Sequence, residues 1–223
     1  MLASFPFSVY NRNVITLRIR SRYREEYIQE PIQETGEVDR GGRGAGRHAP
    51  QPDHQLSYII IEGRRIRGKN FYFPAKAVNR YARKVHGLSV HDLWRLSEGK
   101  TFEDRMDEIY RDFVDCKLVI GHDVAGDVKY IRREFQRYGL TLPNYPIFCT
   151  LKHYTEEAHI PLKQNPNVLK PPRLEELCNH FGLTPDFIAA RCKKWYGGGD
   201  HYHDARFDAA AAYLCMVVGE QMG

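Results

Sequence analysis

The clearest hydrophobic pattern in the chain is an almost continuous apolar run over Leu56–Ile61, rich in isoleucine and typical of a β-strand. Gly63 follows as a turn residue, and the chain continues through Arg64–Gly68 into the aromatic stretch Lys69–Phe73. A strand, a glycine turn and a second strand predict a β-hairpin that begins at about Gln55.

Helical periodicity follows this hairpin. We expect helices over roughly 75–84 and 102–114, because apolar side chains recur in the second stretch at helical spacing. The apolar run Cys116–Ile120 predicts a buried strand. After it, Val128, Ile131, Phe135 and Tyr138 recur every three or four residues and predict an amphipathic helix that Gly139 ends.

The last part of the chain alternates between short strands and helices. Ile147–Thr150 predicts a strand, Arg173–Phe181 a helix ended by Gly182, and Ala205–Val218 a final helix. Strands gathered early and helices alternating later predict an α/β fold, with a mixed central sheet flanked by helices.

Arginine and lysine are unevenly distributed along the chain. Residues 1–54 contain eight arginines and no lysine, whereas residues 55–223 contain fourteen arginines and eleven lysines. We assign residues 1–24 to an N-terminal segment of uncertain structure and residues 25–223 to one domain, in which the glycine- and proline-rich stretch 37–54 is a flexible loop. An upstream frameshift or a misassigned start would produce the same break, and translation of the neighbouring reading frames would distinguish these origins.

Overall composition fits one globular domain, with 223 residues of which 42% are hydrophobic and 27% charged. No stretch approaches the roughly 20 apolar residues of a membrane helix, and the first residues lack the order of a secretory signal. Five widely separated cysteines suit reduced thiols. We therefore expect a soluble, cytoplasmic protein without a membrane partner. The formal charge of +5 is compatible with a polyanionic partner but does not require one.

Two aspartates lie at predicted helix starts, each five residues after a histidine: Asp127 after His122, and Asp208 after His203. A carboxylate in the first turn of a helix can hold a divalent cation, and a histidine on the preceding loop can deprotonate water. The alternative is purely structural, because the helix dipole favours an acidic residue in the first turn by roughly 0.3–1 kcal/mol.

Both pairs correspond to motifs of one nuclease family. The chain resembles the DEDDh 3′–5′ exonucleases, the family of polymerase proofreading subunits and RNase T, over about residues 55–218. His203 and Asp208 match its third motif, a histidine five residues before an aspartate at the start of the last helix. Its second motif, His-Asn-x-x-Phe-Asp after a buried strand, is matched at its ends by His122 and Asp127.

The resemblance implies a ribonuclease-H-like exonuclease fold and hydrolysis of phosphodiester bonds at the 3′ ends of single-stranded DNA or RNA. In that family four carboxylates hold two Mg²⁺ or Mn²⁺ ions about 3.5–4 Å apart. Carried over to this chain, Asp127 and Asp208 are metal ligands and His203 is the general base. The residues expected to approach the substrate strand are His86, His122 and Tyr130.

The family's first motif, Asp-x-Glu-Thr-Thr-Gly on the first strand, is not intact. The candidate is Tyr27–Gly36, and its two possible alignments place either Pro31 or Ile32 at the aspartate position. The aspartate that bridges both metal ions is missing in each, and proline cannot donate to a strand ladder. Glu34 is the metal ligand retained from this motif, with Glu30 four residues earlier on the same strand face.

These motifs predict a metal-dependent 3′–5′ exonuclease, for which the resemblance suggests a polymerase or DNA-repair partner. The degraded first motif supports an alternative from a different class. A nuclease fold that has lost turnover would act as a nucleic-acid-binding or interaction module.

Overall fold

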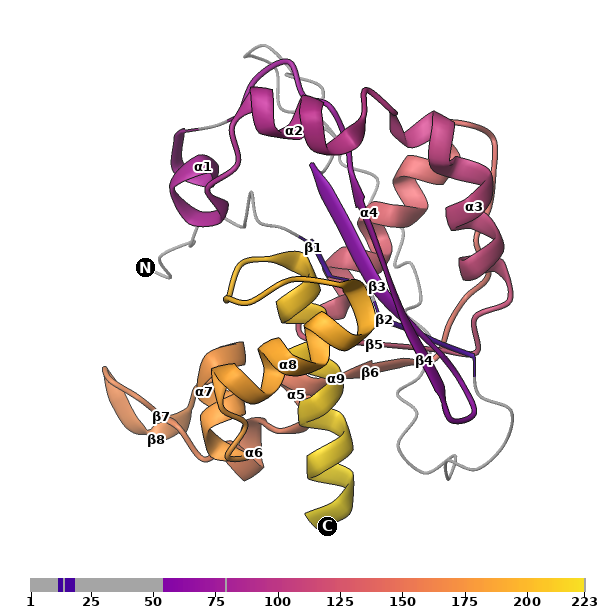
Figure 1. Cartoon of the computed structure of the whole chain (residues 1–223). Helices are drawn as coiled ribbons and strands as arrows, with labels where there is room; N and C mark the ends of the chain where they lie inside the picture. The colour runs from indigo at the N-terminus through magenta and orange to yellow at the C-terminus, as the bar shows by residue number, and fades with distance from the viewer. Residues whose placement is uncertain (1–11, 14, 19–53, 79, 223) are drawn as a thin grey trace, which may run out of the picture.

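A six-stranded mixed sheet forms the centre of the molecule (Figure 1). The computed structural model describes residues 12–13, 15–18, 54–78 and 80–222. Strands β3 (Gln55–Glu62) and β4 (Arg65–Tyr72) form the antiparallel hairpin that the sequence predicts. On the other side of the sheet, β5 (Leu118–Gly121) and β6 (Ile147–Cys149) pair in parallel, close to the ranges expected for them.

Two short strands fill the position between β3 and β5. β1 (Arg12–Asn13) and β2 (Ile15–Arg18) both run parallel to β3. On the edge of β3 opposite β4, β1 pairs with residues 56–57 and β2 with residues 60–62. β2 is antiparallel to β5, with Thr16 opposite Val119. The sheet therefore includes residues that the sequence analysis assigned to the N-terminal segment. The sequence of β2, Ile-Thr-Leu-Arg, contains no acidic residue.

Strand β3 is buried on both faces, and its successive side chains enter two different cores. Leu56, Tyr58 and Ile60 enter the first core, whereas Ile59 and Ile61 enter the second. Burial on both sides explains why this strand is almost continuously apolar.

Helices cover both faces of the sheet. α3 (Phe102–Val114) and α4 (Val124–Gln136) contribute to the first core. α7 (Leu174–His180), α8 (Pro185–Tyr196) and α9 (Ala205–Met222) contribute to the second. The structure thus confirms an α/β fold with a mixed sheet flanked by helices (Figure 1).

Several helices differ from the sequence-based expectation. The helix expected over 75–84 begins only at Arg80, because residues 74–78 connect the end of β4 to α1 (Arg80–His86). α2 (Val90–Ser97) and α8 are unexpected, since each buries few apolar side chains. The other short elements that the sequence did not reveal are α5 (Thr150–His153), α6 (Thr155–Ala158), β7 (Pro161–Leu162) and β8 (Asn165–Leu169).

The interior contains all five cysteines as buried thiols. None of the helices in the described part of the chain has the length and apolar character needed to cross a membrane.

Helix α8 packs closely on the hairpin, and this packing gives a test of the fold. A Cβ atom at Gly68 in β4 would overlap the ring of Tyr196 at the end of α8. We expect Gly68→Ala to lower the free energy of unfolding by about 1–3 kcal/mol. The matched control is Gly126→Ala in α4, where a Cβ meets no atom within 4 Å and helix propensity favours alanine by about 0.5–1 kcal/mol. Urea denaturation measures both, and equal stability of the two variants would contradict the packing described.

Candidate active site

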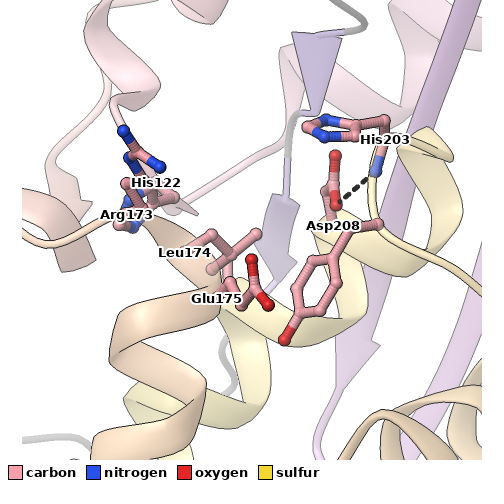
Figure 2. Close-up of a pocket in the computed structure, with 8 residues that line it drawn as sticks. His122, Arg173, Leu174, Glu175, His203 and Asp208 are labelled. Atoms are coloured by element: carbon pink, nitrogen blue, oxygen red, sulfur yellow. Dashed lines mark hydrogen bonds between the residues drawn. The ribbon is translucent and has the colours of Figure 1, made fainter. Parts of the chain in front are cut away.

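A cavity of about 280 Å³ lies where the start of α9, the start of α7 and the end of β5 meet. In Figure 2, His203 and Asp208 lie on one side of it, His122 and Arg173 lie on the other, and Glu175 lies between them. The histidine of the second motif and both residues of the third, far apart in the sequence, therefore share one cavity. Its lining consists of His122, Arg173, Leu174, Glu175, Tyr202, His203, Asp208 and Ala212.

The His203–Asp208 pair is held together by the loop that precedes α9. The backbone N–H of His203 donates to Oδ1 of Asp208 over 3.1 Å (Figure 2). His203 has a left-handed backbone conformation, φ +72°, which few residues other than glycine adopt. Asp208 thereby caps the loop from the first turn of α9, and the imidazole and the carboxylate lie next to each other on the cavity wall.

An ion pair between the buried Asp204 and the partly buried Arg206 anchors this loop. Nε of Arg206 donates to Oδ1 of Asp204 over 2.9 Å, its Nη2 donates to Oδ2 over 2.5 Å, and its backbone N–H also donates to Oδ1. The side-chain amide of Gln55, at the start of β3, reaches the same carboxylate over 3.4 Å. Burial raises the pKa of Asp204, but the hydrogen bonds and charge of Arg206 outweigh it, so the net pKa is lowered. The start of α9 is thus fixed to the sheet.

His122 holds the opposite wall. Its ring lies between the hydroxyl of Thr150 and the carbonyl of Pro172, each 3.0 Å from a ring nitrogen. Because a carbonyl oxygen only accepts, Nε2 carries the proton. Burial lowers the pKa of His122 to about 4, and the Pro172 carbonyl offsets this only in part. At neutral pH His122 is therefore a neutral link between the end of β5 and the residue before Arg173.

The other predicted site residues lie elsewhere. Asp127 and Tyr130 belong to α4, and neither lines this cavity. His86 ends α1 outside the lining, where its Nδ1 accepts from the backbone N–H of Leu88 over 3.0 Å. Glu34 lies outside the described residues. The predicted residues that the cavity brings together are His122, His203 and Asp208.

Sequence reasoning missed three polar residues of the lining. Arg173 and Glu175 flank the start of α7, and Tyr202 directly precedes His203. A signal for the first two exists, because the pair Pro171-Pro172 fixes where this helix can begin. Arg173 gives the cavity a positive charge on the side opposite Asp208 (Figure 2).

The side chains of the cavity that could ligate a metal ion do not complete a metal centre. Asp208 and Glu175 offer carboxylate oxygens, the ligands that Mg²⁺ prefers. Across residues 54–78 and 80–222 and strands β1 and β2, however, no three His, Cys, Asp or Glu side chains are grouped to hold a metal ion. Two reasons are that β2 brings no carboxylate to the middle of the sheet and that Asp127 is not on the cavity wall. The described residues therefore do not fit the two-metal site that the resemblance implies.

No protein-family model matches this chain, and neither does any curated protein. The interpretation of the cavity therefore rests on its motifs and its geometry.

The buried imidazole of His122 makes stability depend on pH. Its pKa rises from about 4 in the folded protein to the ordinary 6.5 on unfolding, so the unfolded chain binds the proton first as the pH falls. The contribution is fully present above pH 6.5 and is lost towards pH 4, by up to about 1.4 kcal/mol per pH unit. We expect His122→Gln to flatten this part of the profile of unfolding free energy, measured with urea. Parallel profiles for the two proteins would contradict a buried neutral His122.

Proposed function

We propose that the protein is a 3′–5′ exonuclease of the DEDDh type with a ribonuclease-H-like fold, and that its cavity receives the 3′ end of a single strand of DNA or RNA. The observation that carries the proposal is that His122 and the His203–Asp208 pair, which resemble two motifs of that family, line the same cavity. The mixed sheet with helices on both faces, and the position of Asp208 at the start of the last helix, support it further.

The two sides of the cavity have different roles in the reaction. Water attacks the terminal phosphorus, and His203 accepts the proton of the attacking water. The bond from phosphorus to the 3′ oxygen of the preceding nucleotide breaks, and that oxygen takes a proton from solvent. Arg173, on the opposite side, supplies a positive charge for the phosphate oxygens. The cavity volume of about 280 Å³ lies just below the range for ligand pockets, roughly 300–1,000 Å³.

One observation favours a second candidate, a nuclease-fold module that binds nucleic acid without hydrolysing it. In the described part of the chain, the carboxylates do not gather into a metal-binding group. Both candidates predict affinity for single strands, and they differ only in turnover.

Hydrolysis is tested with 5′-labelled single-stranded DNA and RNA in the presence of Mg²⁺ or Mn²⁺. We expect a ladder that shortens from the 3′ end. His203→Ala should slow it at least about 100-fold, the contribution typical of a general base, and Asp208→Ala should also suppress it. Gel electrophoresis of samples taken over time measures each rate.

The neighbouring histidine provides the matched control. His201 is exposed and hydrogen-bonds to Asp200 over 2.6 Å, away from the cavity lining, so His201→Ala should keep the activity of the unaltered protein. Loss of activity in His201→Ala but not in His203→Ala would overturn the assignment of the base. Binding of the strands without laddering in either metal would reject the exonuclease in favour of the binding module.

A further inference from the structure

The segment from Lys76 to Lys100, which contains α1 and α2, is unusually basic, and we refer to it as the basic arm. It holds six lysines and arginines but only two acidic residues. All six basic side chains are exposed. They are Lys76, Arg80, Arg83, Lys84, Arg95 and Lys100.

The acidic residues of the arm do little to neutralise this charge. The carboxylate of Asp92 accepts from the backbone N–H and the hydroxyl of Ser89, as the capping box at the start of α2. Glu98 pairs with Lys100 over 3.0 Å. Among the described residues, no acidic side chain forms a salt bridge with any of the other five cations. The arm therefore presents a surface of net positive charge.

An exposed tryptophan lies within this charged surface. Trp94 in α2 is 61% exposed, and Val90, one turn earlier on the same helix, is 38% exposed. Tryptophan is one of the residue types that are buried most on average, so an indole this exposed within a basic surface points to a binding surface. Cationic side chains combined with an exposed aromatic ring are the combination that binds single-stranded nucleic acid, because phosphates meet the cations while a base stacks on the ring.

Contacts along the sheet place the arm near the candidate active site. The backbone N–H of Phe73, between the end of β4 and the arm, donates to the carbonyl of His54 over 2.9 Å, so the chain enters the arm beside the start of β3. The next residue, Gln55, donates to Asp204, which adjoins His203. In Figure 1, α1 and α2 lie on the side of the molecule towards which the N-terminal end of α9 points. The arm and the His203 loop therefore both lie near the N-terminal end of β3.

We propose that the basic arm binds the part of the single strand that leads into the cavity, with Arg80, Arg83, Lys84 and Arg95 contacting phosphates and Trp94 stacking on a base. This inference rests on the proposed function for the nature of the ligand, but not on turnover. It assigns the terminal nucleotide to the cavity and the preceding nucleotides to the arm.

A second basic surface, on α8, serves as the control. Phe187 there is 41% exposed, but the guanidinium of Arg191 covers its ring, 4.8 Å from the centroid, so the ring is less open to a base. Lys193 and Lys194 are exposed neighbours on this helix and match Arg83 and Lys84 in number and charge. Removing either pair changes the net charge equally, so a difference between them reports local contact.

The test measures binding of a 5′-fluorescein oligothymidylate by fluorescence anisotropy, with EDTA present so that metal-dependent hydrolysis does not interfere. We expect Trp94→Ala to weaken binding at least about 5-fold, the lower end for loss of one stacked base, and Phe187→Ala to leave it unchanged. Replacing both Arg83 and Lys84 with alanine should reduce the slope of log affinity against log salt by about 0.7 for each phosphate that the protein no longer neutralises. Replacing both Lys193 and Lys194 should leave the slope as it is.

Trp94 also provides a direct spectroscopic signal. The chain has two tryptophans, so Trp195→Phe leaves Trp94 as the single indole, and we expect its fluorescence to be quenched when the strand binds. Equal effects of the α1 and α8 variants, an unquenched Trp94, or no binding at all would overturn the inference. The proposed function can fail separately: arm-dependent binding without hydrolysis in the metal assay would retain the arm and reject the exonuclease.

Discussion

The ion pair between the buried Asp204 and the partly buried Arg206 is the interaction on which the candidate site depends. The Asp204 carboxylate accepts from the backbone N–H and the side chain of Arg206, at the start of α9. It also accepts from the side-chain amide of Gln55, which ties the start of α9 to the sheet. His203 precedes Asp204 directly, and Asp208 follows one turn later, so both functional side chains take their positions from this anchor. Without Arg206, the Asp204 carboxylate, only 9% exposed, would keep its burial and lose its counter-charge, an arrangement that is strongly destabilising.

The rest of the fold holds the other side of the cavity in place. Alternate side chains of β3 enter two cores. The core that contains Ile59 and Ile61 packs α7 and α9 against the same face of the sheet. Cys178 of α7 and Cys215 of α9 meet there with their sulfur atoms 3.6 Å apart. His122 then ties the end of β5 to the residue before Arg173. Each wall is therefore positioned before any ligand arrives, which lowers the entropic cost of binding one.

Local patterns in the sequence predicted those helices and strands whose formation depends on residues close together in the chain. The hairpin of β3 and β4 follows from a strongly apolar strand and a glycine turn, and α3, α4, α7 and α9 follow from helical spacing. α8 escaped notice although Thr184 and Gly197 mark its ends, because only Ile188 and Cys192 are fully buried. Of the residues in the two motifs, His122, His203 and Asp208 line one cavity, whereas Asp127, expected as a metal ligand, does not. The contact between Gln55 and Asp204 could not be foreseen, since it joins residues 149 positions apart. Nor could the sequence show that a strand without acidic residues lies between β3 and β5.

The proposed function requires a 3′ end to enter the cavity beside His203. Photocrosslinking detects this contact, with a photoreactive thiothymidine placed at the 3′ terminus of a single strand and the crosslinked peptide identified by mass spectrometry. We expect crosslinks to the two segments that line the cavity, residues 173–175 and 202–208, and their loss from these segments when the thiothymidine is moved to the 5′ terminus. Crosslinks outside both segments, or the same pattern from either terminus, would contradict it.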